Sequence, residues 1–403
     1  MPLMTPADAE FSLLSTEDGR ALLAEVEAAP RPGPAELARW RNGAPAEVVS
    51  AAVHLAEARR RGRAKFERAD RMWLDPTGLE QATAEAVSRH KATRFRGSST
   101  VVDLCCGIGG DAIALAREAG RVIAVDRDEG MARRTRWNAG VYEVGDRVSV
   151  VVADAERFEL PEGALVHVDP DRRVEGARRA AQRLADYHPG PEFLLGLAHR
   201  SPGGAIKLGP ASDFDAHFSG DRFEVELVSL GGEAKEATVW FGGLVSCRRR
   251  ATRLPEEATW TDRDGPPGAY ASSRPLDRWA FDPDPALLRS GLVDSFAEAH
   301  GLGRITEAAD FLTGPSRVDS PFLAAFEVIE ELPVDVKALR RAALDRGIGT
   351  MEIKVRGMEI RPETLRTQLR LKGRGAASLL LVGGGRSGPA RAVLARRASR
   401  VGA

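Results

Sequence analysis

Short apolar runs alternate with longer stretches of helical periodicity through the middle of the chain. The runs are rich in Val, Ile and Leu, which is typical of buried strands. Because helical stretches separate them, the pattern predicts an α/β fold with a doubly wound, mostly parallel sheet. The predicted strands are 100–104, 121–125, 148–152, 164–168, 204–208, 222–230 and 237–242.

The last two predicted strands are separated only by the segment GGEAKE, residues 231–236. A connection this short cannot hold a crossover helix, so we expect this pair to be antiparallel. The sheet is therefore predicted to be parallel except for one antiparallel strand.

The same pattern predicts four regions along the chain. Residues 1–75 form a helical segment, residues 76–250 hold the sheet, and residues 251–285 form a Pro- and Gly-rich connector without periodicity. Residues 286–403 form a small α+β domain, which opens with a helix near Pro285. Its further predicted elements are helices at 335–346 and 362–371 and strands at 350–355 and 377–382.

Composition narrows the class of protein. Of 403 residues, 43% are hydrophobic and 29% are charged, as in soluble globular proteins. No apolar run is long enough for a membrane span, and the first residues do not resemble a signal peptide. Three cysteines are too few for a disulfide framework, so we expect a reducing cytoplasm. The seven histidines lack metal-ligand spacing, so we expect no metal.

Charge is unevenly distributed although the net charge is zero. Residues 331–403 contain 16 Lys and Arg against 6 Asp and Glu, a net charge of +10, which leaves −10 for residues 1–330. A basic C-terminal region suggests a polyanionic partner. The alternative is a solvated arginine-rich face, because Arg outnumbers Lys throughout the chain.

A glycine loop follows the first predicted strand in VVDLCCGIGGDAIALA, residues 101–116. Gly107 and Gly109 allow a tight turn and a close approach of the backbone to a ligand. The helix that starts near Gly110 presents free N–H groups. Taken alone, this loop also satisfies a relaxed dinucleotide fingerprint.

Three acidic strand ends favour S-adenosylmethionine over a dinucleotide. Asp103, four residues before Gly107, is placed to meet a cationic amino group and would repel a pyrophosphate. Asp126 ends the second strand, where it can accept both ribose hydroxyls, and Asp154 ends the third, where it can accept an adenine amino group. The alternative is that these residues cap helices.

The motif Asp103-x-x-Cys106-Gly107-x-Gly109 and the sequence that follows it resemble the trimethylguanosine synthase (RNA cap guanine-N2 methyltransferase) family of class I, Rossmann-like methyltransferases. The similarity covers roughly residues 70–245 and includes DRMWLDPTGLEQAT upstream. The C-terminal region resembles a THUMP-like domain. The resemblance implies S-adenosylmethionine as cofactor, with Cys105 among its contacts, and RNA as partner.

The fourth strand ends in Asp169-Pro170-Asp171-Arg172. Amino-group methyltransferases carry (D/N/S)-P-P-(Y/F/W) here, so Asp171 replaces a proline and Arg172 replaces the aromatic residue. Asp169 and Asp171 are the candidate catalytic residues, which would orient a nucleophile or accept its proton. Pro170 and Arg172 are expected to contact substrate, Arg172 through a phosphate or by stacking on a base. Alternatively, Asp171 and Arg172 pair with each other on the surface.

Two further polar residues lie on predicted strands. Lys207 is a candidate substrate contact, because ligands of such sheets bind at the carboxyl ends of the strands. His167 has apolar neighbours and is interpreted as structural.

The sequence as a whole predicts an S-adenosylmethionine-dependent methyltransferase that acts on RNA and docks it through the C-terminal domain. One alternative is a methyltransferase of proteins or small molecules. Another is an RNA-binding protein that keeps the fold without catalysis, which the altered motif at residues 169–172 leaves open.

Overall fold

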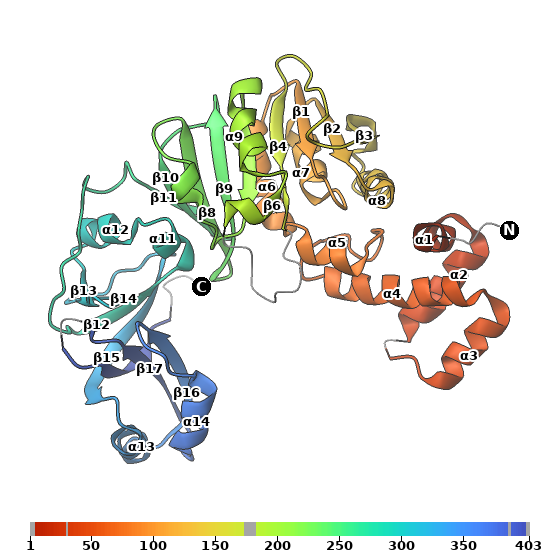
Figure 1. The fold of residues 1–403 in the computed structure, drawn as a ribbon. Coiled ribbons are helices and arrows are strands. Elements are labelled where there is room, and N and C mark those ends of the chain that lie inside the picture. Colours follow the sequence, from red (N-terminus) through yellow and green to blue (C-terminus); the bar gives the residue numbers. More distant parts are fainter. Residues whose placement is uncertain (1–4, 30, 173–182, 386–387, 400–403) are drawn as a thin grey trace. The chain divides into compact units, whose positions relative to one another are not determined.

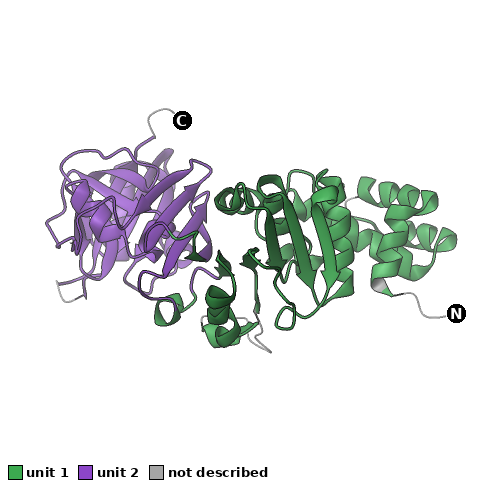
Figure 2. Cartoon of the chain, turned by 90° about the horizontal axis from the view of Figure 1, so that it is seen from above, with its two compact units in different colours: residues 1–208, 212–217, 239–245 green, residues 209–211, 218–238, 246–403 purple. Residues whose placement is uncertain are grey.

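The computed structural model describes residues 5–29, 31–172, 183–385 and 388–399. They form two compact units, which Figure 2 colours separately. Unit 1 comprises residues 1–208, 212–217 and 239–245, and unit 2 comprises residues 209–211, 218–238 and 246–403.

Unit 1 begins with helices, as the sequence predicts (Figure 1). Thr5 and Thr16 start two of them, because each hydroxyl accepts a hydrogen bond from a backbone N–H of the first helical turn. The fourth helix packs against the other three. The four are α1 (Pro6–Ser15), α2 (Glu17–Ala28), α3 (Pro34–Gly43) and α4 (Ala46–Gly62).

The sheet of unit 1 contains five mutually parallel strands in the order β7-β4-β1-β2-β3. Their predicted positions agree with the structure to within one residue at each end, and the mostly parallel α/β fold is confirmed. The carboxyl ends of parallel strands share one edge of the sheet, which brings the acidic strand ends to that edge. The strands are β1 (Thr100–Leu104), β2 (Arg121–Asp126), β3 (Val148–Val152), β4 (Leu165–Val168) and β7 (Gly203–Leu208).

Helices of unit 1 share one hydrophobic core with the sheet and with the N-terminal helices; the core includes Leu13, Trp73 and Val101. A small antiparallel pair, β5 (Asp171–Arg172) and β6 (Tyr187–His188), follows β4 in the chain. The remaining helices are α5 (Pro76–Gln81), α6 (Glu85–Ala92), α7 (Gly110–Glu118), α8 (Glu129–Val141), α9 (Pro191–Arg200) and α10 (Phe214–His217), with 3₁₀ turns at Thr93–Phe95, Gly145–Arg147 and Leu184–Asp186.

Strands β8 (Phe223–Leu230) and β9 (Glu233–Gly242) are joined by two glycines, so they form the expected antiparallel hairpin. Gly231 and Gly232 have φ values of +63° and +85°, which suit a two-residue hairpin turn. The predicted start of the second strand at residue 237 is therefore wrong, because the two glycines alone make the turn. β9 begins in unit 2 and ends in unit 1.

The expected connector, residues 251–285, contains ordered strands. β10 (Arg249–Leu254) pairs in parallel with β8 and antiparallel with β11 (Ala258–Thr261). The sequence of β10, RRATRL, shows no clear apolar run. Hydrogen bonds satisfy the polar side chains of β10, so the strand is partly buried without an apolar run. Apolar periodicity therefore did not predict it.

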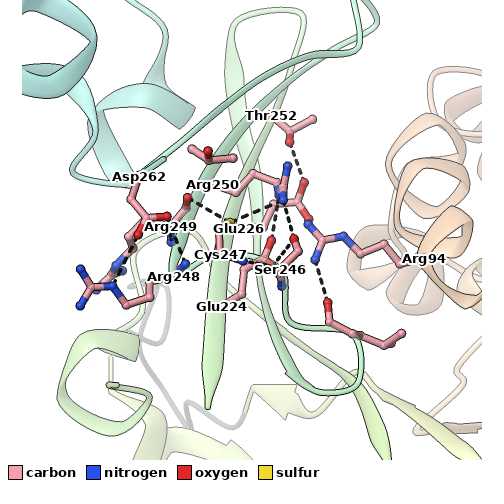
Figure 3. Close-up of polar contacts among 12 residues, drawn as sticks. Arg94, Glu224, Glu226, Ser246, Cys247, Arg248, Arg249, Arg250, Thr252 and Asp262 are labelled. Atoms are coloured by element: carbon pink, nitrogen blue, oxygen red, sulfur yellow. Dashed lines mark hydrogen bonds and ion pairs between the residues drawn. The ribbon is translucent and has the colours of Figure 1, made fainter. Parts of the chain in front are cut away.

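Buried carboxylates on β8 hold β10 and the segment before it (Figure 3). Glu224 is fully buried and accepts hydrogen bonds from the backbone N–H of Ser246 at 2.8 Å and from Arg250 Nε at 2.8 Å. Glu226, also buried, accepts from the hydroxyl of Thr252 at 2.6 Å. These bonds satisfy polar side chains that alternate with buried apolar residues such as Leu227 and Ala251 on the same strands.

The second sheet of unit 2 has the order β13-β14-β12-β15-β18-β17-β16. Its neighbouring strands are antiparallel except β16 and β17, which are parallel and joined through α14 (Pro362–Leu369). Its strands are β12 (Trp279–Pro283), β13 (Gly303–Thr306), β14 (Ala309–Gly314), β15 (Leu323–Pro333), β16 (Ile348–Arg356), β17 (Gly375–Val382) and β18 (Arg391–Arg397).

Helix α13 (Val336–Asp345) and α14 fall where the sequence predicts helices, and both pack against β16. The helix expected near Pro285 is instead two helices, α11 (Pro285–Arg289) and α12 (Val293–Ala299). Gly291 separates them with a φ of +75°, a conformation that ends a helix. In the part of the chain that the structure describes, no helix is long and apolar enough to cross a membrane.

Candidate functional site

The loop between β1 and α7 adopts the conformation that its glycines permit. Gly107 and Gly109 have φ values of +55° and +86°. A Cβ atom on Gly107 would meet nothing within 4 Å, so this backbone borders open space that a ligand can enter. Cys105 also has a positive φ, of 60°, which is strained for a residue with a side chain.

Side chains of α8 hold this loop in place. The hydroxyl of Thr135 donates to the carbonyl of Gly107 at 2.7 Å, and Asn138 Nδ2 donates to the carbonyl of Ile108 at 2.9 Å. Asn138 also bonds the backbone N–H and carbonyl of Trp73. Thr135 and Asn138 are fully buried, so the loop is fixed by the protein alone.

Asp126 lies at the end of β2 against the same loop. Its Oδ2 accepts from the backbone N–H of Gly107 at 2.9 Å, and its Oδ1 accepts from that of Asp128 at 2.9 Å. Burial raises the pKa of Asp126, and these two hydrogen bonds lower it in part. Each oxygen keeps acceptor capacity for a further hydrogen bond.

Three of the predicted acidic residues lie at the ends of neighbouring strands beside Cys105. Burial raises the pKa of this thiol, and the charges of Asp126, Asp169 and Asp103 raise it further. The tertiary structure therefore brings the ends of β1, β2 and β4 to one place. Asp154, after β3, is partly exposed, and its Oδ1 accepts from the backbone N–H of Glu156.

Asp103 and His167 form a buried pair across β1 and β4. Both side chains are fully buried, and His167 Nδ1 lies 2.6 Å from Asp103 Oδ1. Burial raises the pKa of Asp103, and the neighbouring imidazole lowers it in part. The interpretation of His167 as a packing residue missed this partner, because only the register of the two strands places it there.

Asp169 follows β4 and pairs with Lys207 of β7. Lys207 Nζ lies 2.5 Å from Asp169 Oδ2 and also donates to the backbone carbonyl of Gln81 at 3.2 Å. Lys207 is buried, whereas the side chain of Asp169 keeps 29% exposure. These protein acceptors use two of the three donors of the Lys207 ammonium group, and its predicted contact with substrate stays a prediction.

Asp171 has a partner that the sequence did not suggest. Its Oδ1 accepts from Gln81 Nε2 at 3.0 Å. The expected alternative, a pair with Arg172, is not tested, because the side chain of Arg172 lies outside the described residues. Pro170, which lies between Asp169 and Asp171 in the sequence, is buried.

Gln81 belongs to a segment that is fixed against the glycine loop. Lys65 Nζ donates to three carbonyls at the end of α5, namely those of Leu79, Glu80 and Ala82. Gly78 packs so closely on Ile108 that a Cβ atom would lie 2.5 Å from its Cγ2. Gln81 and Thr135 were missed by sequence reasoning, although Gln81 lies in the quoted stretch DRMWLDPTGLEQAT.

The arrangement suits a ligand that offers hydrogen-bond donors and a positive charge. Asp126 and Asp169 keep acceptor capacity on their carboxylate oxygens, and a Cβ atom on Gly107 would meet nothing within 4 Å. Within the described ranges, no group of three or more His, Cys, Asp or Glu side chains is placed to hold a metal ion. Asp169 Oδ1, which Lys207 does not use, can accept a proton or orient an N–H or O–H group.

Three family models match parts of the chain. One described as RNA cap guanine-N2 methyltransferase matches residues 98–182, which include the glycine loop and Asp169. One described as THUMP domain-like matches residues 323–397, within the second sheet of unit 2. A domain of unknown function matches residues 8–62, within the N-terminal helices.

Several proteins with similar sequences are named as methyltransferases. Two uncharacterized S-adenosylmethionine-dependent methyltransferases, from two strains of Mycobacterium tuberculosis, are each 36% identical over 305 residues, 75% of this chain and 82% of theirs. A ribosomal RNA small subunit methyltransferase A from Anaeromyxobacter dehalogenans is 33% identical over 130 residues, 32% of this chain and 43% of that protein.

One crystal structure is similar along nearly the whole chain. It is of a protein from Porphyromonas gingivalis W83 that carries a provisional methyltransferase name. The match covers 97% of this chain and 99% of that one, with a TM-score of 0.75 and 21% sequence identity. This likeness shows that the two proteins share a fold.

Proposed function

The chain belongs to the S-adenosylmethionine-dependent methyltransferases, and we propose that it transfers the methyl group of this cofactor to RNA. S-adenosylmethionine supplies an electrophilic methyl group on a sulfonium. The protein has to hold the cofactor, orient the acceptor atom and remove a proton from it. Its three cysteines are free, which agrees with the reducing cytoplasm that we propose as its compartment.

The cofactor residues are assigned to the carboxyl edge of the sheet in unit 1. Asp126 holds the ribose, because each of its oxygens has one backbone donor and room for a hydroxyl. Asp154 accepts the adenine amino group and Asp103 the methionine amino group. The backbone at Cys105, Gly107 and Gly109 contacts the cofactor, and the missing Cβ of Gly107 leaves space beside it.

Asp169 and Asp171 act on the methyl acceptor. Lys207 fixes one oxygen of Asp169 and leaves the other to accept a hydrogen bond from the acceptor group. Gln81 fixes Asp171 in the same way. The two carboxylates therefore orient the acceptor by hydrogen bonds, with Pro170 between them. Arg172 follows as a phosphate or base contact.

The observation that carries the RNA assignment is an exposed basic loop in unit 2 with a closely packed backbone. Arg366, Arg370, Lys372 and Arg374, on α14 and the loop after it, are all exposed. The loop packs tightly on residues 346–349, since a Cβ atom on Gly373 would lie 1.8 Å from the carbonyl oxygen of Gly347. A closely packed backbone presents these exposed cationic side chains together, and neighbouring Lys and Arg side chains bind the phosphates of nucleic acids.

The comparisons support the same substrate. Two of the matching family models are described as RNA cap guanine-N2 methyltransferase and as THUMP domain-like. A protein that is similar over 130 residues is named a ribosomal RNA methyltransferase. The THUMP-like match, residues 323–397, includes the basic loop.

Turnover tests the proposal. The full-length protein is incubated with S-adenosylmethionine labelled on its methyl group and with total RNA, a protein extract or a small-molecule fraction from cells that lack the protein. We expect label in the RNA with wild type and a strongly reduced rate with Asp171→Ala. Nucleoside mass spectrometry of the labelled RNA then identifies the modified base. Label in protein or small molecules alone would contradict the proposal.

A further inference from the structure

The Asp103–His167 pair leaves two buried polar atoms without a partner. Asp103 Oδ2 and His167 Nε2 find no hydrogen bond among the described residues, although both side chains are fully buried. A buried polar atom without a partner costs free energy, and exceptions in a folded protein call for an explanation.

Packing does not explain the pair. Its neighbours along β1 and β4, Val102, Leu104, Val166 and Val168, are all fully buried apolar residues. Two apolar side chains at the same register would fill this space without unsatisfied atoms. Residues that break the local pattern at such a cost are expected at functional sites.

We propose that His167 is a positioning residue for the cofactor: it donates Nδ1–H to Asp103 Oδ1 and so leaves Oδ2 as the acceptor for the methionine amino group. A carboxylate can only accept, so the imidazole is the donor when Asp103 is ionised. The inference rests on the cofactor site proposed above, and it adds a residue that the methyltransferase motif does not include.

The surrounding charges explain why Asp103 needs this donor. Burial is the largest cause that raises the pKa of Asp103, and the carboxylates of Asp111 on α7 and Asp169 after β4 raise it further. Asp111 pairs with the buried Lys91 of α6 at 3.0 Å, and Lys207 pairs with Asp169, so both nearby cations are already engaged. Among the described residues, His167 is the side chain that bonds Asp103 and favours its ionised form.

Matched substitutions separate the proposed role from a packing role. In His167→Asn, the amide nitrogen corresponds to Nδ1, whereas in His167→Gln it corresponds to Nε2. Calorimetry of the full-length variants measures the affinity for S-adenosylhomocysteine, which has the amino group, and for 5′-methylthioadenosine, which lacks the amino-acid portion. Thermal unfolding records whether each variant folds.

We expect His167→Asn to bind S-adenosylhomocysteine within about threefold of wild type and His167→Gln to bind it about tenfold more weakly. Both should bind 5′-methylthioadenosine almost as wild type does. An equal loss for both ligands, or equal behaviour of the Asn and Gln variants, would overturn the inference.

Asp103→Asn distinguishes this failure from a failure of the cofactor site. If Asp103→Asn selectively weakens S-adenosylhomocysteine but His167→Gln does not, the site stands and the role of His167 is wrong. If Asp103→Asn binds both ligands like wild type, the cofactor site itself is wrongly assigned. Should His167→Gln fail to fold, His167→Leu replaces it as the variant without a donor.

Discussion

At the scale of single residues, Asp126 is predicted to be the strongest cofactor contact. Asp126→Ala removes the proposed acceptor of two ribose hydroxyls and also frees the backbone N–H of Gly107. Hydrogen bonds to a charged acceptor contribute about 1.5–3 kcal/mol each, so the affinity for S-adenosylmethionine should fall at least tenfold. Calorimetry measures this loss.

Asp128→Ala is the matched control for Asp126→Ala. Asp128 caps α8 through the backbone N–H of Met131 and has no proposed contact with the cofactor. We expect a lower melting temperature and nearly unchanged affinity. An unchanged affinity in folded Asp126→Ala would refute the ribose assignment.

Asp171 is predicted to act in turnover but not in cofactor binding. Asp171→Ala removes the acceptor of Gln81 Nε2, which donates at the surface of the site. The affinity for the cofactor should stay near that of wild type while the turnover of labelled S-adenosylmethionine on RNA falls strongly. Gln81→Ala should lower the rate by a smaller factor, because Asp171 stays in place.

Two outcomes would revise this assignment. An equal loss of cofactor affinity and rate in Asp171→Ala would indicate a structural role. An unchanged rate would place Asp171 outside the reaction.

At the scale of elements, strand β10 depends on a buried carboxylate of β8. Glu224→Ala leaves Arg250, whose side chain is 18% exposed, without its carboxylate partner. Breaking a buried ion pair by removing one partner costs about 3–5 kcal/mol. Chemical denaturation, followed on the transition of unit 2, should show this loss, and Glu224→Gln should be less destabilised.

The control lies on the same hairpin. Glu233 pairs with Lys235 at the start of β9, and both side chains are exposed. Glu233→Ala should leave the unfolding transition nearly unchanged. A similar free energy of unfolding for Glu224→Ala and Glu233→Ala would mean that the buried network contributes little to the stability of unit 2.

At the scale of the whole molecule, RNA binding is predicted to depend on the basic loop after α14. Each phosphate contact contributes about −0.7 to the slope of log affinity against log salt on single strands. The triple variant Arg366→Ala, Lys372→Ala, Arg374→Ala should therefore flatten the slope by roughly two units. Fluorescence anisotropy with a labelled single-stranded RNA measures the slope.

A triple variant of equal charge serves as the control. Arg31, Arg41 and Arg61 are exposed in the N-terminal region, so their substitution by Ala removes the same charge elsewhere. Equal slopes for the two triple variants would contradict RNA binding by the basic loop and would indicate that its arginines reflect only the composition of the chain. A truncation at residue 286 is not a suitable test, because unit 2 extends from residue 246 to the end and would be cut within its fold.

The sequence by itself determined the features that are local along the chain. Asp103 and Gly107 lie four residues apart, and a strand, a glycine loop and a helix follow in order, so the motif predicts its own geometry. The inner strands β1 and β4 are nearly continuous apolar runs, because both of their faces are buried. The mostly parallel α/β fold and the acidic strand ends were therefore predictable.

Only the tertiary structure decided the partners of these acidic residues. His167 bonds Asp103, which lies 64 positions away in the sequence. Gln81 bonds Asp171 at a separation of 90 positions, and Lys207 bonds Asp169 at a separation of 38. Such contacts depend on strand order, on register and on how a distant segment packs over the sheet edge. Strand β10 was missed for the same reason: its Arg250 and Thr252 bind carboxylates on β8, and no local periodicity records these partners.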